Sequence, residues 1–195
     1  TAQTVKANAM ILCSNITSVV VEHPGVEFED YSVGFVYNGT MQKQSVTIQG
    51  CYQALVEAYA NEYGFEYQSL NSGLCGDTMF WQYDTAKRIL TITGSGDMFS
   101  YSSVEELPWS SYLATVRTIT IADGVSSLSD YAFYNATALR TLTMPLSVDA
   151  PSNDTIWYGC ANITKINLTL GTGVMDDYAT SYSDTSYRYT PWYLS

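Results

Sequence analysis

Short runs in which apolar and polar residues alternate recur along the chain, and each predicts a brief strand with one buried face. The clearest three place apolar residues at their first, fourth and sixth positions, at residues 116–121, 139–144 and 163–168. They begin 23 and then 24 residues apart, and an earlier copy lies at residues 16–21. This regular spacing indicates internal repeats.

A repeat of 23 or 24 residues lies within the range of about 20–29 residues of leucine-rich repeats and predicts a solenoid, because one repeat cannot bury its apolar face alone. We expect Cys13 and Cys160 to share one register before the strands and to pack in the interior as small apolar residues. The inward repeat positions are Val116, Ile119, Ile121, Leu139, Leu142, Met144, Ile163, Ile166 and Leu168. Four cysteines would permit two disulfides in a secreted protein, but for Cys13 and Cys160 we favour buried thiols.

One segment has the period of a helix instead. Over residues 53–63, Ala54, Leu55, Ala58 and Tyr59 fall on one stripe, and Gly64 occupies the position where a helix often ends in a left-handed residue. No good N-cap side chain precedes this segment, so its start is less well defined than its end.

Several segments of the chain follow a known pattern. Residues 124–134 (GVSSLSDYAFY) resemble the repeat of the BspA-like leucine-rich-repeat bacterial surface proteins, and residues 46–67 resemble the strand, helix and strand that end many of these arrays. Residues 75–77 (CGD), Trp81, residues 94–98 (GSGDM) and residues 108–109 (PW) are similar to a segment that opens a further array. The spacing at residues 146–154 departs from the family pattern.

The resemblance implies a leucine-rich-repeat solenoid of short strands and irregular or 3₁₀ return segments, with one α-helix near residues 53–63 and two partial arrays. We expect residues 1–70 to be the end of one array, with a strand–helix–strand terminus. Residues 71–195 would be an opening cap module at about 74–112, followed by repeats at about 113–195. On this interpretation the chain is a fragment of a longer protein.

Composition narrows the choice of function. The chain has 195 residues and a net charge of −11, and its 22 threonines and 21 serines supply polarity that charged residues, at 14%, do not. The 46% hydrophobic content excludes a disordered chain. The acidic balance and the lack of a basic run in the sequence argue against nucleic acid and anionic membranes as partners. No apolar run reaches the length of a membrane-spanning helix, so we expect no membrane insertion.

The sequence offers little for catalysis. The single histidine, His23, precedes a proline after an apolar run and is interpreted as a turn residue. No nucleophile-elbow, zinc, calcium-loop or phosphate-loop motif is present, and we expect no cofactor and no metal. Adjacent acids occur at Glu29–Asp30, Glu105–Glu106 and Asp176–Asp177, but neighbouring acids on a loop are more often solvated than a glycosidase pair.

Aromatic residues crowd the Ser- and Thr-rich end of the chain, and Tyr182, Tyr187, Tyr189 and Trp192 are the candidate ligand contacts. They could instead pack between coils. The family resemblance implies a non-enzymatic, extracellular or cell-surface segment that binds a protein or glycan on another cell surface or matrix, as an adhesin does. A carbohydrate-binding module and a structural spacer are the alternatives.

Overall fold

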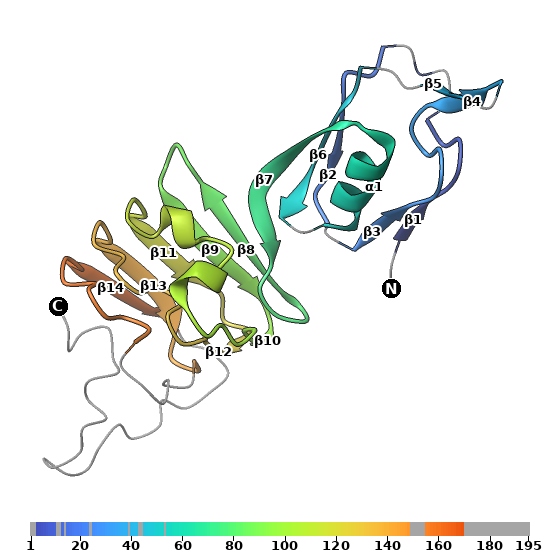
Figure 1. The fold of residues 1–195 in the computed structure, drawn as a ribbon. Helices are drawn as coiled ribbons and strands as arrows, with labels where there is room; N and C mark the ends of the chain where they lie inside the picture. The colour runs from blue at the N-terminus through green and yellow to red at the C-terminus, as the bar shows by residue number, and fades with distance from the viewer. Residues whose placement is uncertain are drawn as a thin grey trace, which may run out of the picture. The chain divides into compact units, whose positions relative to one another are not determined.

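The computed structural model describes residues 3–10, 13, 15–23, 25–38, 40–42, 45–52, 54–148 and 155–169. The chain divides into two compact units, Thr1–Gly73 and Leu74–Ser195 (Figure 1). Each unit has its own apolar core. The described residues are rich in strands and contain one α-helix.

The first unit is built on a small parallel sheet. Its elements are β1 (Gln3–Val5), β2 (Ser18–Val21), β3 (Val26–Phe28), β4 (Phe35–Tyr37), β5 (Thr40–Gln42), β6 (Thr47–Tyr52), α1 (Leu55–Tyr63) and β7 (Glu66–Leu74). Strand β6 lies between β2 and β7, with Thr47 paired to both Ser18 and Glu66. The helix contacts β3 and β6, and it closes a core that includes Ile48 and Val56.

The helix differs from its prediction in its start and in its buried face. It begins at Leu55, and its N-cap residue Ala54 makes no side-chain capping bond, which agrees with the lack of a capping residue in the sequence. Gly64 ends it at φ +67°, in the left-handed conformation expected there. The buried face is Val56, Tyr59 and Ala60, whereas Leu55 and Ala58 are exposed, because the stripe that meets β3 and β6 is rotated from the predicted one.

The second unit holds the repeats. Its elements are β8 (Met79–Asp84), β9 (Ile89–Gly94), β10 (Gly96–Asp97), η1 (Val104–Glu106), η2 (Ser110–Tyr112), β11 (Thr118–Ile121), β12 (Val125–Ser127), β13 (Thr141–Pro145) and β14 (Lys165–Thr169). Strands β8 and β9 form an antiparallel hairpin, and β9, β11, β13 and β14 then follow side by side in parallel (Figure 1). Thr118 pairs with Thr141, and Thr141 with Lys165, so neighbouring strands are one repeat apart.

Alternate residues of these strands point into the core, as a period of two requires. Ile119 and Leu142 are fully buried partners on neighbouring strands, while Thr118 and Thr141 beside them are only half-buried. The other inward positions up to Ile163 are also buried: Val116, Ile121, Leu139, Met144 and Ile163. Ile166 is half-buried and Leu168 is 47% exposed, because β14 is the last strand of the described sheet and no described strand covers its far side.

The two cysteines that share a repeat register have different environments. Cys160 is buried, and its Sγ lies 3.2 Å from the carbonyl oxygen of Phe133 in the preceding repeat. Cys13 is exposed, which contradicts the prediction that it packs in the interior. It precedes β2, the border strand of the first unit's parallel sheet, where the described residues offer no earlier repeat to pack on.

Candidate binding surface

The outward face of the repeat strands carries polar side chains in register. Thr91, Thr120, Thr143 and Asn167 occupy one row across β9, β11, β13 and β14. The Nδ2 of Asn167 donates a hydrogen bond of 3.0 Å to the Oγ1 of Thr143. This face therefore presents hydroxyl and amide groups at regular intervals, with donors and acceptors suited to a polar partner.

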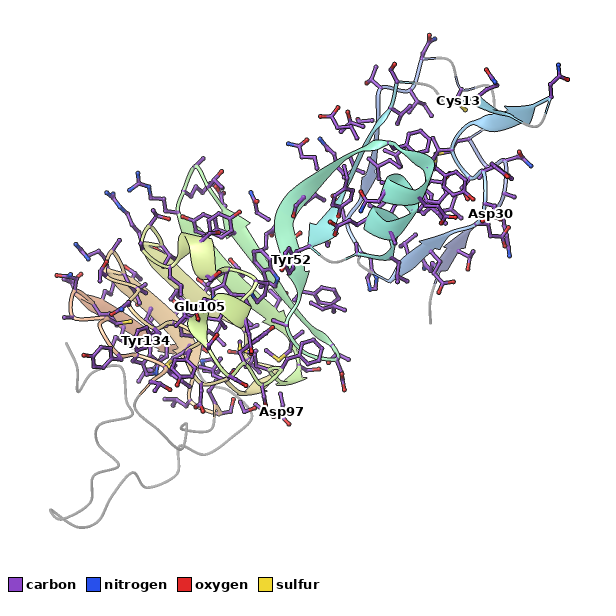
Figure 2. The ribbon with its side chains drawn as sticks, viewed as in Figure 1. Cys13, Asp30, Tyr52, Asp97, Glu105 and Tyr134 are labelled. Atoms are coloured by element: carbon purple, nitrogen blue, oxygen red, sulfur yellow. The ribbon has the colours of Figure 1, made fainter. Side chains whose placement is uncertain are left out.

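A second surface lies on the segments that return between strands. Tyr134 and Tyr158 stack with ring centroids 5.1 Å apart and planes at 14°, and Tyr131 meets Tyr134 edge to face at 5.9 Å. The amide of Asn135 donates to the carbonyl of Tyr158 at 2.7 Å, which fixes the two segments side by side. Tyr158 is 52% exposed. We call Tyr131, Tyr134 and Tyr158 the tyrosine ladder; Tyr134 is labelled in Figure 2.

Sequence reasoning placed the aromatic contacts elsewhere. Tyr182, Tyr187, Tyr189 and Trp192 all lie outside the described residues. The tyrosine ladder was missed, although the sequence carries a signal for it. The aromatic pairs Phe133–Tyr134 and Trp157–Tyr158 stand 24 residues apart, in the same place in successive repeats. The first ring of each pair is buried, and the second is left at the surface.

One acid in each of the two described pairs has a lowered pKa. Hydrogen bonds from the Lys6 ammonium and the Ala7 amide lower the pKa of Glu29. Hydrogen bonds to its own backbone and to Ser103 lower the pKa of Glu105. The general acid of a glycosidase needs a raised pKa, so neither group resembles one. Asp176 and Asp177 lie outside the described residues.

The buried thiols are poor nucleophiles. Burial raises the pKa of Cys75 to about 12 and that of Cys160 to about 11, and it also raises the pKa of Cys51. A thiol reacts through its thiolate, so these groups stay inert near neutral pH. Within the described ranges, no three His, Cys, Asp or Glu side chains gather as a metal site would require.

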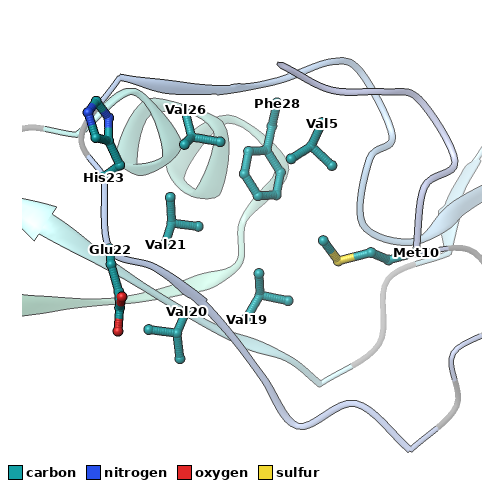
Figure 3. A pocket seen from close by; sticks show the side chains of 9 residues that line it. All are labelled: Val5, Met10, Val19, Val20, Val21, Glu22, His23, Val26 and Phe28. Carbon is teal, nitrogen blue, oxygen red and sulfur yellow. The ribbon is translucent and has the colours of Figure 1, made fainter. Parts of the chain in front are cut away.

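The first unit contains an open apolar pocket of about 370 Å³ (Figure 3). Valines from β1, β2 and β3, together with Met10 and Phe28, line most of it, and Glu22 and His23 lie at one end. The Nδ1 of His23 accepts a hydrogen bond of 3.1 Å from the amide of Gly25, so the residue closes a local turn. Nothing in this pocket combines an acid, a base and a nucleophile.

In comparisons with known families, curated proteins and solved structures, the family match lies in the second unit. Residues 97–189 match the sequence model of the BspA type leucine rich repeat region, in 6 copies. A solved structure of a leucine-rich repeat protein from Eubacterium ventriosum is similar at 17% identity and a TM-score of 0.40, over 49% of this chain. The chain spans only 27% of that protein's length. A search of curated proteins finds no match. No helix in the described part of the chain is long and apolar enough to cross a membrane.

Proposed function

Because residues 97–189 carry BspA-type leucine-rich repeats, we propose that this chain is a non-enzymatic, extracellular or cell-surface segment that binds a protein on a host or neighbouring surface, as an adhesin does. The repeats themselves support a role in protein interaction or at a surface. Families of this type generally lack enzymatic activity, and BspA-type repeats are commonly surface-associated in bacteria.

The arrangement of strands supports this proposal. We infer that β9, β11, β13 and β14 are successive coils of a solenoid, since they pair in parallel and β11, β13 and β14 are one sequence repeat apart. A solenoid presents an extended surface, which suits the binding of a macromolecule better than that of a small substrate. We retain the assignment of residues 1–70 to the end of one array and of residues 71–195 to a cap module with repeats.

The single observation that carries the function is the tyrosine ladder. Tyrosine gives a large rigid contact area with a polar end, and it is enriched among the residues that dominate protein–protein binding energy. Tyr134 and Tyr158 hold each other in place, so little side-chain entropy remains to be lost when a partner binds. Beneath them, Phe133 and Trp157 are buried and stacked, which gives the ladder a rigid support.

Carbohydrate binding is the second candidate, because an exposed tyrosine ring can also stack on a sugar ring. A spacer without any ligand is the third. The three differ in what the ladder does: it contacts a protein, contacts a neutral sugar, or contacts nothing.

The test uses the full chain, immobilised, with purified extracellular-matrix proteins and an array of neutral glycans as separate probes. Tyr158→Ala is the test variant. Phe99→Ala is the matched control, because Phe99 is a 41% exposed aromatic in the same unit and outside the ladder. We expect at least one matrix protein to bind and Tyr158→Ala to weaken that binding by about tenfold, with Phe99→Ala unchanged.

Binding of neutral glycans alone, lost in Tyr158→Ala, would replace the protein partner by a sugar. Equal losses of binding in Tyr158→Ala and Phe99→Ala would show that the tyrosine ladder is not the contact surface. No binding by either probe would favour the spacer.

A further inference from the structure

The second unit carries a row of positive charge that runs across its repeats. Arg88 lies just before β9, Arg117 before β11 and Arg140 before β13, and Lys165 is the first residue of β14. All four residues are exposed. We call these four residues the basic row. These four residues stand at least 23 positions apart in the sequence, so they form no basic run there. Only the fold brings them together.

Backbone hydrogen bonds fix the row residue by residue. The amide of Arg117 donates to the carbonyl of Arg88 at 2.9 Å, and the amide of Arg140 donates to the carbonyl of Arg117 at the same distance. On β14 the equivalent bond to the carbonyl of Arg140 comes from the amide of Thr164 at 2.9 Å. Lys165 is one residue further along and pairs with Thr141, and its amide also donates to the carbonyl of Arg140, at 3.0 Å. Neighbouring strands lie about 4.8 Å apart, so the three arginines extend over about 10 Å in two steps. Lys165 lies one strand further on, shifted by one residue along the chain.

The row lacks acidic partners. Among the residues that the structure describes, none of its four members makes an ion pair; the Asp84 carboxylate nearby is paired with Lys87 at 3.1 Å instead. The guanidinium of Arg140 donates to the carbonyls of Thr137 and Leu139. Like charges on neighbouring strands repel each other, so the row is a site that an anion would stabilise.

The acids near the repeat strands lie mostly at the opposite strand ends. Asp97 follows β9 and Asp123 follows β11, each beyond the carboxyl end of its strand, and Asp97 is labelled in Figure 2. Their carboxylates accept hydrogen bonds from Ser127 and Thr169. Charge is therefore separated along the strands, with cations at the amino ends.

We propose that the basic row is a binding site for an anionic glycan, a sugar chain that carries sulfate or carboxylate groups. The three arginines, in register and with Lys165 beyond them, match a linear polyanion, and arginine donates to oxyanions in a fixed fork geometry. This site is separate from the tyrosine ladder and does not depend on the function proposed for it.

The neighbouring side chains favour a glycan over other polyanions. Thr118, Thr141 and Thr164 flank the row, and threonine hydroxyls can donate to and accept from sugar hydroxyls. Single-stranded nucleic acid requires aromatic platforms for its bases, and the residues flanking the row are not aromatic. A net charge of −11 on the chain repels a long duplex, whereas a short glycan meets only the local positive field.

The test measures binding of the full chain to a heparin octasaccharide, which is sulfated, to polygalacturonate, which is carboxylated, and to neutral dextran. Arg117→Gln/Arg140→Gln is the test variant, and Arg117→Lys/Arg140→Lys keeps the charge. Lys6→Gln, in the first unit, is compared with Arg117→Gln because each removes one positive charge. Circular dichroism checks that every variant is folded.

We expect one of the two anionic glycans to bind and dextran not to bind. The double glutamine variant should bind about tenfold or more weakly, and the slope of log affinity against log salt should fall by about two. The double lysine variant should bind more weakly than the parent chain but more tightly than the double glutamine variant, because lysine keeps the charge and lacks the fork geometry of arginine. Lys6→Gln should retain all of the binding. The stronger of the two glycans identifies sulfate or carboxylate as the anion.

Three results would overturn the proposal: no binding of either anionic glycan at low salt, equal losses in Lys6→Gln and Arg117→Gln, or tighter binding of single-stranded DNA or polyglutamate than of both glycans. Failure of the matrix-protein experiment leaves this outcome unaffected, since the two tests change different residues and use different probes.

Discussion

Phe133 and Trp157 stack in the core of the second unit, with ring centroids 4.8 Å apart and planes at 29°. They stand 24 positions apart and occupy the same place in successive repeats. The amide of Phe133 also donates to the carbonyl of Ile156 at 3.2 Å. Adjacent repeats are thus joined on the return side by stacked rings as well as by the strand ladder.

This stack predicts that alanine substitution at two neighbouring residues lowers the free energy of unfolding by very different amounts. Trp157 is 2% exposed and Tyr158 is 52% exposed. We expect Trp157→Ala to lower the free energy of unfolding by about 3–5 kcal/mol, because it leaves a cavity in a packed core. Tyr158→Ala should cost less than about 1 kcal/mol. Urea denaturation followed by tryptophan fluorescence and circular dichroism measures both, and similar costs for the two variants would contradict the assignment of inner and outer rings.

Gly94 and Gly96 offer a second matched pair. Both have positive φ, +98° and +92°, but a Cβ on Gly94 would lie 2.0 Å from the carbonyl oxygen of Thr78, whereas a Cβ on Gly96 would meet nothing within 4 Å. Gly96→Ala should therefore cost only backbone strain, about 1–2 kcal/mol. Gly94→Ala should cost clearly more, because the hairpin of β8 and β9 must shift.

The melting temperatures of Gly94→Ala and Gly96→Ala, measured under the same conditions, compare the two costs directly. Equal losses in melting temperature would show that the close approach of Gly94 to Thr78 adds nothing to the strain.

The strand register was predictable from the sequence to a large extent, and the burial of individual residues less so. Aligning the repeats places Thr118, Thr141 and Lys165 at one position, and these residues are strand partners in the structure. The alternation of apolar and polar residues can be recognised from neighbouring positions in the sequence, so it predicts the register without knowledge of the fold. The exposure of Cys13 and Leu168 depends on whether another repeat covers them, which no local pattern encodes.

The proposed binding surfaces also combine features that the sequence predicts with features that depend on the fold. The tyrosine ladder and the basic row each collect residues that stand 23 or more positions apart, with the exception of Tyr131 and Tyr134. The net charge of the chain sums over all positions, so a net charge of −11 gives no indication that cations gather locally. Alignment by repeat register places Tyr134 with Tyr158 and Arg117 with Arg140, because equivalent positions become neighbours when strands pair in parallel. It leaves out Arg88, which precedes a strand outside the repeat spacing, and Lys165, which aligns with Thr141.

In the first unit, we expect the removal of two tyrosine hydroxyls to lower the free energy of unfolding by unequal amounts. The Tyr59 hydroxyl accepts a hydrogen bond of 3.0 Å from the buried amide of Val33, and the Tyr67 hydroxyl donates at 2.6 Å to the carbonyl of Cys51. Tyr59→Phe leaves a buried N–H without its acceptor, so we expect a loss of about 1–3 kcal/mol. Tyr67→Phe should cost about 1 kcal/mol, because a carbonyl tolerates the loss of one donor better.

Denaturant titration monitored by circular dichroism at the helix signal compares the two variants. A greater cost for Tyr67→Phe would contradict the role assigned to the Tyr59 hydroxyl.

Alkaline pH should destabilise the second unit through its buried thiols. Burial raises the pKa of Cys75 to about 12 and that of Cys160 to about 11, from 9.0 for an exposed thiol. Well below pH 9 both thiols are protonated in the folded and the unfolded chain, so their stabilising contribution is complete. Between pH 9 and about 11 the unfolded thiols release protons that the folded ones keep, and the free energy of unfolding falls by about 1 kcal/mol per pH unit for each thiol.

The double variant Cys75→Ala/Cys160→Ala isolates this effect from the tyrosines, which also titrate in this range. Its stability at pH 8 should be lower, because two buried side chains are truncated, but its decline from pH 9 to 10.5 should be shallower than that of the parent chain. Both chains are compared by urea denaturation with a phosphine reductant present. Parallel declines would mean that the thiols ionise equally in the folded and unfolded states, and therefore that they are not buried in solution.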